Sequence, residues 1–112
     1  MKIKPRLKLW FVDDKGEYVF GLGTMRLLAA IDRLGSINAA SRELTMSYRY
    51  ALERITTVEE RLGRSLVERT RGGKDGGGAK LTAFGRAILK EYEELETSLE
   101  RLIDRHIDLS DD

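Results

Sequence analysis

The sequence predicts a single α+β domain that is mainly helical, with an N-terminal β-hairpin, three helices, a second hairpin and a long C-terminal helix. Three patterns predict this fold class. The first residues alternate between apolar and charged side chains, as in a half-buried strand. Three helical stretches bounded by capping residues follow, and a glycine-rich stretch then separates two strand-like segments. A chain of 112 residues buries one modest core, so residues 1–112 are expected to form one domain.

Residues 3–20 are predicted to form the first hairpin. Its first strand carries its apolar side chains on one face: Ile3, Leu7, Leu9 and Phe11. The sequence DDKG at 13–16 is a turn signal, and EYVF returns as the second strand. Trp10 lies on the opposite, charged face, so we expect a neighbouring element or a second subunit to cover it.

Residues 24–62 are predicted to form three helices. Thr24 is expected to cap the first helix, which ends at Gly35. The inward-facing residues expected on this helix are Leu27, Leu28, Ile31 and Leu34. Ser36 then has the position and residue type of the cap of a short second helix.

The third helix is expected to begin after its cap Ser47 and to stop at Gly63. Its expected inward-facing residues are Tyr48, Ala51, Leu52, Ile55, Val58 and Leu62. A tight connection, TMS at 45–47, separates it from the second helix. Residues 37–62 therefore have the pattern of a helix-turn-helix, a unit whose second helix enters the major groove of DNA.

The glycine-rich stretch RTRGGKDGGGAKLT at 69–82 has three possible roles. A phosphate-binding P-loop requires Gly-Lys followed by Ser or Thr, whereas Lys74 is followed by Asp75. A linker is disfavoured, because the flanking segments LVERT and AKL are too short to be stable strands unless they pair. Residues 66–81 are therefore predicted to be a hairpin with a glycine-rich tip, and a helix-turn-helix followed by such a wing is a winged helix-turn-helix.

Residues 82–107 are predicted to form a long helix capped by Thr82. At the standard helical rise it measures ~39 Å, which exceeds the width of so small a domain, so part of its apolar stripe needs a partner. The spacing of this stripe is close to a heptad repeat, and Tyr92 lies beside it. The predicted dimer seam consists of Phe84, Ile88, Leu95, Leu99 and Leu102.

The formal net charge of +1 is unevenly distributed. Residues 1–81 contain 16 Lys or Arg and 10 Asp or Glu, whereas residues 82–112 contain 4 and 9. A basic body with an acidic tail suits a protein whose body approaches a polyanion, although a solvated charged surface explains the pattern equally well. The sequence has no cysteine and no apolar run of membrane-spanning length, so we expect a cytoplasmic protein without disulfides or a membrane partner.

The residue types that an enzyme requires are not combined in this sequence. There is no cysteine, and the single histidine, His106, is near the end of the long helix. The acidic run KEYEELE at 90–96 has the spacing of a solvated helix face and lacks a metal-binding pattern. We therefore expect no catalytic site, no cofactor and no bound metal.

The third helix offers nucleic-acid-binding groups opposite its apolar stripe. Arg49, Tyr50 and Arg54 are placed to reach bases or phosphates from its first turns. Ser47, at the N-cap, is placed to hold a phosphate. In the wing, basic side chains supply charge, and glycines let the backbone approach the sugar-phosphate chain. The residues predicted to contact DNA are Ser47, Arg49, Tyr50, Arg54, Thr57, Arg69, Arg71, Gly72, Gly73, Lys74 and Lys80.

Two segments, GSINAASRELTMSYRYA and LVERTRGGKDGGGAKLTAFG, resemble the N-terminal DNA-binding domain of the molybdate-responsive ModE family over about residues 20–90. The stretch ALERITTVEERLGRSLVERT with LTAFG is also similar to LysR-type domains, which are related winged helices. The resemblance implies a dimeric regulator that binds palindromic operators. It further implies that Ser47, Tyr48, Arg49 and the wing lie at the DNA.

The sequence departs from the ModE pattern in two ways. Leu52 stands where that family commonly has Trp, so we expect the core to differ in detail. The sequence holds no counterpart of the molybdate-binding domains, so we do not expect these residues to sense molybdate, and an effector carried by a separate chain stays open. Two alternatives to a specific regulator also stay open: a winged-helix module that binds another protein, and a non-specific, chromatin-type DNA binder.

Overall fold

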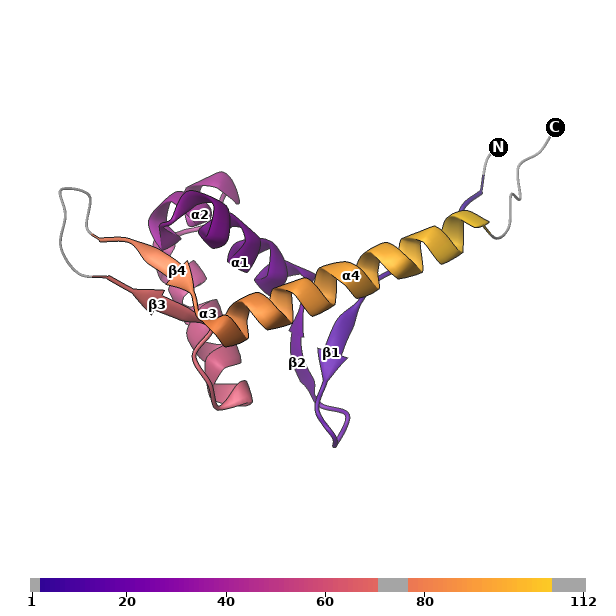
Figure 1. The fold of residues 1–112 in the computed structure, drawn as a ribbon, viewed down its shortest axis with the longest axis horizontal. Coiled ribbons are helices and arrows are strands. Elements are labelled where there is room, and N and C mark those ends of the chain that lie inside the picture. The colour runs from indigo at the N-terminus through magenta and orange to yellow at the C-terminus, as the bar shows by residue number, and fades with distance from the viewer. Residues whose placement is uncertain (1–2, 71–76, 106–112) are drawn as a thin grey trace.

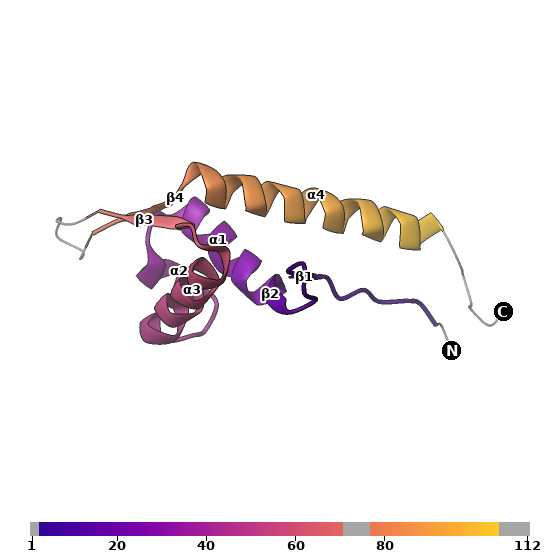
Figure 2. The same cartoon turned by 90° about the horizontal axis from the view of Figure 1, so that it is seen from below.

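The computed structural model describes residues 3–70 and 77–105, and its elements follow the order β1, β2, α1, α2, α3, β3, β4, α4 (Figure 1). The predicted fold class is confirmed: an N-terminal β-hairpin, three helices, a wing and a long C-terminal helix. In Figure 2, α1 lies between α4 on one side and α2 and α3 on the other. The helix-turn-helix and the wing are therefore carried at one end of the molecule, and α4 extends toward the other.

The first hairpin pairs β1 (Trp10–Val12) with β2 (Tyr18–Gly21) in an antiparallel sheet of two strands. Asp13 closes the turn, because its carboxylate accepts hydrogen bonds from the amides of Lys15 and Glu17 at 2.8 and 2.9 Å. The prediction of a strand beginning at residue 3 was wrong, since residues 3–9 form no strand. The reason is that β2 ends opposite Trp10 and continues directly into a helix, which leaves the earlier residues without a strand to pair with.

Helix α1 (Leu22–Leu34) begins three residues earlier than the predicted cap at Thr24 implies, with Gly21 as its N-cap. Thr24 is therefore not a cap; it lies inside the helix and is buried. Gly35 ends the helix in a left-handed conformation with φ of 71°, as predicted. The expected inward position of Leu34 was wrong, because this side chain is exposed at the helix end.

Helices α2 (Ile37–Glu43) and α3 (Tyr48–Leu62) form the predicted helix-turn-helix. Each helix is capped as expected. The hydroxyl of Ser36 accepts a hydrogen bond from the Ala39 amide at 3.1 Å. At its other end α3 stops at Gly63, whose φ of 69° favours glycine. These local signals define where α2 and α3 begin and where α3 ends.

The hydrophobic core lies where α1 meets α2, α3, α4 and both hairpins. Its larger buried side chains are Phe20, Met25, Leu27, Leu28, Ile31, Ile37, Ile55, Val58, Leu66, Leu81, Leu89 and Tyr92. Leu52 and Leu62, both expected to face inward, are partly buried at the edge of this core. Because α1 packs against α2, α3 and α4, it fixes the helix-turn-helix relative to α4.

The wing pairs β3 (Val67–Arg69) with β4 (Ala79–Leu81), in the register Val67 opposite Leu81. Beyond the strands, the amide of Thr70 donates to the carbonyl of Gly78 at 2.9 Å, so the pairing continues toward the tip. The outer end of the strand pair is attached to the end of α1, because the Ala79 amide donates to the Gly35 carbonyl at 2.9 Å. The two strands are therefore held against the body along their length, and the wing projects beyond them (Figure 1).

Helix α4 (Ala83–Arg105) is capped by Thr82 as predicted, since the threonine hydroxyl accepts from the Gly85 amide at 2.9 Å. The last positions of the predicted helix, 106 and 107, lie outside the described residues. Tyr92 was expected beside the dimer seam but is buried in the core of its own chain. Its hydroxyl donates to the Leu9 carbonyl at 3.0 Å, and its ring lies 5.9 Å from that of Phe11.

Candidate nucleic-acid interface

The turn between α2 and α3 fixes the angle at which α3 is presented. The amide of Met46 donates to the Ser41 carbonyl at 2.9 Å, and Thr45 adopts a φ of 58°. A left-handed conformation is uncommon for a β-branched residue. Leu44 and Met46 pack against the core on either side of it. The turn is therefore held by hydrogen bonds and by partly buried side chains, so α3 has a defined orientation relative to α2.

The first turn of α3 combines a capped N-terminus with exposed polar side chains. The hydroxyl of Ser47 accepts a hydrogen bond of 3.0 Å from the Tyr50 amide and so caps the helix. The amides of Tyr48 and Arg49 precede the first intrahelical hydrogen bond, which leaves them available to an acceptor from outside the chain. Arg49 pairs with Glu53, one helical turn further along α3, at 3.5 Å. Both side chains are highly exposed, so the pair is weak and leaves Arg49 free to exchange partners.

Tyr48 faces outward, and the prediction that it belongs to the inward stripe of α3 was wrong. Tyr48 is the first residue of α3, and Ala51 is the first residue of this helix that reaches the core. The side chain of Tyr48 is therefore exposed. Its phenol oxygen accepts a hydrogen bond of 3.3 Å from Arg69, at the end of β3. The exposed start of α3 and the outer end of the strand pair in the wing are therefore in direct contact.

Arg54 lies one turn further along α3, and its guanidinium is bound within the chain. One nitrogen donates to the hydroxyl of Thr24 at 3.4 Å, and another donates to the phenol oxygen of Tyr50 at 2.5 Å. Thr57, the next predicted contact, is exposed on the same helix. Arg61, further along, donates to the Val19 carbonyl at 3.0 Å and lies over the ring of Tyr18.

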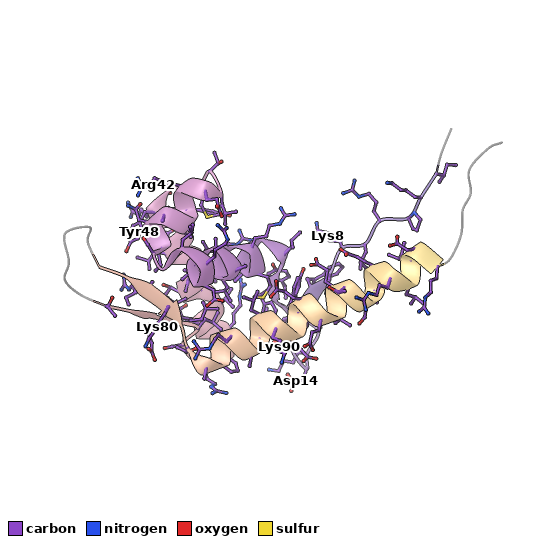
Figure 3. The ribbon with its side chains drawn as sticks, turned by 45° about the horizontal axis from the view of Figure 1, so that its top comes forward. Lys8, Asp14, Arg42, Tyr48, Lys80 and Lys90 are labelled. Carbon is purple, nitrogen blue, oxygen red and sulfur yellow. The ribbon has the colours of Figure 1, made fainter. Side chains whose placement is uncertain are left out.

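The described part of the wing carries one of its predicted lysines. Lys80 is exposed on β4, and its ammonium is 3.8 Å from the carboxylate of Glu68 across the hairpin. The predicted contacts at the tip lie outside the described residues: Arg71, Gly72, Gly73 and Lys74. In Figure 3, Lys80 and Tyr48 lie at the same end of the molecule, toward which the wing projects.

The five residues of the predicted dimer seam occupy two different environments on α4. Phe84 and Ile88, in its first turns, pack against the core of their own chain, and Arg64 covers the ring of Phe84 at 3.9 Å. Leu95 and Leu102 are 38% and 45% exposed on the part of α4 that extends away from the body (Figure 1). Leu99, between them, is half-buried.

Neither a metal site nor a membrane span is found in the part of the chain that the structure describes. Across residues 3–70 and 77–105, no three His, Asp or Glu side chains are grouped so that they could hold a metal ion. Within the same ranges, every helix is too short or too polar to cross a membrane.

The sequence profile of one family, described as "Bacterial regulatory helix-turn-helix protein, lysR family", matches residues 22–86. The chain belongs to this LysR family. The match begins with α1 and ends in the first turn of α4, so it contains the helix-turn-helix and the wing. The N-terminal hairpin and most of α4 lie outside the residues matched.

Individual relatives confirm the resemblance to ModE regulators. The molybdenum transport protein ModE of Azotobacter vinelandii is 42% identical over 81 residues, which are 72% of this chain and 30% of that protein. The DNA-binding transcriptional dual regulator ModE of Escherichia coli K12 is 36% identical over 86 residues, 77% of this chain and 32% of that protein. The chain therefore spans about a third of the length of these relatives.

The fold also resembles LysR-type domains of known structure. The CbnR DNA-binding domain, solved in a complex with DNA, superposes with a TM-score of 0.60 at 26% identity, covering 74% of this chain and 90% of that one. The BenM DNA-binding domain, solved with a benA site, superposes with a TM-score of 0.59 at 22% identity, covering 77% and 91%. Together with the family match, this makes the chain a winged helix-turn-helix domain of the LysR and ModE type of DNA-binding transcription regulator.

The LysR-type domain also exposes a basic residue that sequence reasoning did not select. Arg42, in the last turn of α2, is exposed and lies at the same end of the molecule as Tyr48 in Figure 3. The residues predicted to contact DNA all lay on α3 or the wing, so Arg42 was not among them. A basic residue directly before the turn of a helix-turn-helix is the sequence signal that could have identified it. The neighbouring Glu43 carboxylate is paired with Arg33 of α1, which lowers the pKa of Glu43 below its ordinary value.

Proposed function

We propose that this LysR-family chain binds double-stranded DNA of a specific sequence as a homodimer and regulates transcription from a palindromic operator. The observation that carries the proposal is the contact between Tyr48 and Arg69, which puts the exposed first turn of α3 and the outer end of β3 in the wing on one side of the molecule. A helix and a wing arranged in this way fit a major groove and the adjoining backbone.

The contacts proposed on DNA follow from this arrangement. Arg49 and Tyr50 reach base edges from the exposed face of α3, and the free amides of its first turn meet a phosphate. Arg42 adds a phosphate contact from α2. The remaining residues proposed to contribute to the interface from α3 and the wing are Ser47, Tyr48, Arg54, Thr57, Arg69, Arg71, Gly72, Gly73, Lys74 and Lys80. The CbnR and BenM domains, which were solved with DNA, support this assignment by their fold alone.

The proposed homodimer uses the extending part of α4. Leu95, Leu99 and Leu102 lie on one face of a helix that continues beyond the body, and a second copy of the chain would bury them. Two recognition helices would then approach successive major-groove faces about 34 Å apart, which is one turn of DNA. An operator read by such a dimer is an inverted repeat.

A selection from random double-stranded DNA tests the proposal. The purified chain is expected to enrich an inverted repeat whose half-sites are about one turn apart, and binding is expected to weaken as salt rises from 50 to 200 mM, a range of roughly fourfold. Steeply salt-dependent binding without an enriched motif would indicate a non-specific DNA binder. The absence of binding at both salt concentrations would favour a module that binds another protein.

A further inference from the structure

The guanidinium of Arg54 is held between α3 and the start of α1. Its Nε donates to the hydroxyl of Thr24 at 3.4 Å, and its Nη1 donates to the phenol oxygen of Tyr50 at 2.5 Å. The guanidinium carbon also lies 5.7 Å from the centre of the Tyr50 ring. The guanidinium of Arg54 therefore contacts both the hydroxyl and the ring of Tyr50 on α3. Its Nε is bound to Thr24 on α1.

The position of this guanidinium depends on the start of α1. Thr24 is buried, so it provides a fixed acceptor. Gly23 leaves the space that the guanidinium fills, because a Cβ at that position would lie 2.8 Å from Arg54 Nη2. Arg54 is therefore a half-buried residue with partners on both sides, unlike Arg49, whose side chain is almost fully exposed.

We propose that Arg54 is a positioning residue that fixes the phenol of Tyr50 as a hydrogen-bond donor to a base edge, and that it does not neutralise a phosphate. This inference rests on the proposed DNA binding. A guanidinium has only donors, so the phenol oxygen must accept from it and the phenol O–H stays available to donate outward. The positive charge on Arg54 polarises this oxygen, which strengthens the phenol as a donor and weakens it as an acceptor.

The proposal names the chemical class of the group that Tyr50 reads. In the major groove, purine N7, guanine O6 and thymine O4 are acceptors, whereas the cytosine amino group is a donor. The base facing Tyr50 is therefore one that presents an acceptor, and cytosine is disfavoured there. Without Arg54 the phenol is free to rotate and to accept, so the preference at this one position is lost.

Affinity measurements on four variants test the proposal: Arg54→Met, Tyr50→Phe, the double variant, and Arg101→Met on the exposed face of α4 as a matched control. Binding is measured across a salt series on the selected operator and on random DNA. Arg54→Met and Tyr50→Phe are each expected to weaken operator binding about tenfold. The double variant is expected to lose no more than either single variant, because both remove the same interaction.

The salt dependence separates positioning from phosphate contact. Arg54→Met is expected to keep the slope of log affinity against log salt and to leave random-DNA binding unchanged. A slope reduced by about 0.9, with equal losses on both DNAs, would mean that Arg54 neutralises a phosphate, and the inference would be overturned while the proposed function stands. Additive losses in the double variant would overturn it as well. A wild-type chain that prefers no sequence would remove both the inference and the proposed function.

Repeating the DNA selection with Tyr50→Phe measures the base preference of the protein in a way that does not depend on the stability of Arg54→Met. Tyr50 is about half exposed, so loss of its hydroxyl leaves the fold intact. The selected motif is expected to admit cytosine at one position in each half-site and to stay the same elsewhere. A motif identical to that of the wild type would overturn the proposal.

Discussion

The guanidinium of Arg69 donates a hydrogen bond of 3.3 Å to the phenol oxygen of Tyr48, so the last residue of β3 is bonded to the first residue of α3. Both side chains are exposed, and the bond is therefore not a major contributor to folding. Its consequence is geometric. It limits the rotation of two groups that stand side by side at the proposed DNA interface.

Tyr48→Phe tests whether this geometry matters for binding. The variant is expected to bind its selected operator three- to tenfold more weakly, on the order of one hydrogen bond, because Arg69 loses its partner. The free energy of unfolding in urea is expected to change by less than ~0.5 kcal/mol, as at other exposed sites. Tyr18→Phe, which changes the exposed first residue of β2, is the control and should leave DNA affinity unchanged. Equal operator binding by Tyr48→Phe and wild type would show that the bond does not organise the interface.

A second prediction concerns the contact between α4 and Leu66, the residue that directly precedes β3. A Cβ added at Gly85 would lie 2.2 Å from the carbonyl oxygen of Leu66, which is backbone and cannot turn aside. Gly85→Ala is therefore expected to destabilise the fold by about 3 kcal/mol or more in urea unfolding. Ala87→Gly, an exposed change in the same helix, is expected to cost only about 1 kcal/mol. Similar losses in the two variants would contradict the close approach.

The elements that sequence reasoning placed correctly are those whose boundaries are set by local chemistry. The hydroxyls of Ser36 and Ser47 accept hydrogen bonds from backbone amides in the first turns of the helices that follow them. Gly35 and Gly63 adopt the left-handed conformations that end helices. A serine three residues before the amide it caps can be recognised without any knowledge of tertiary contacts. The helix-turn-helix was predictable for this reason.

The errors arose where distant parts of the chain decide the outcome. Alternation predicted a strand from residue 3, but β2 is too short to pair with its first half. Tyr92 lay at the edge of a heptad stripe, yet its hydroxyl meets Leu9, 83 positions earlier. Likewise, the partner of Arg54 on α1 is Thr24, 30 positions away. Periodicity gives the face of a helix but not the element that will cover it.

A third prediction concerns the buried hydroxyl of Tyr92. Tyr92→Phe removes its hydrogen bond to the Leu9 carbonyl, so the variant is expected to unfold about 1 kcal/mol more easily at neutral pH. Tyr18→Phe, which changes an exposed tyrosine at the start of β2, is the control and should unfold like the wild type. Equal stability of Tyr92→Phe and wild type would mean that the N-terminal segment contributes nothing through this bond.

Tyr92 should also make stability depend on alkaline pH. Burial raises the pKa of its phenol above the ordinary 10.0, and the nearby Glu96 carboxylate adds to the effect. Above pH 10 the unfolded chain loses this proton while the folded chain keeps it, so stability falls as pH rises toward the folded value. Below pH 10 the contribution is complete. In urea titrations, the difference between wild type and Tyr92→Phe should be constant below about pH 10 and shrink above it.

The last prediction concerns the exposed leucines on the extending part of α4. Replacing Leu95 and Leu102 together by Glu places charges on the face proposed to meet a second copy. Sedimentation equilibrium is expected to report a dimer for the wild type and a monomer for this variant. Operator affinity is expected to fall about a hundredfold, because each half-site must then be bound independently. Since both leucines are exposed within one chain, the helical signal should be unchanged.

Thr97→Glu adds a charge to a different face of the same helix and should leave the dimer intact. A variant that stays dimeric would place the interface elsewhere, and the half-exposed Trp10 of the N-terminal hairpin would be the next surface to change.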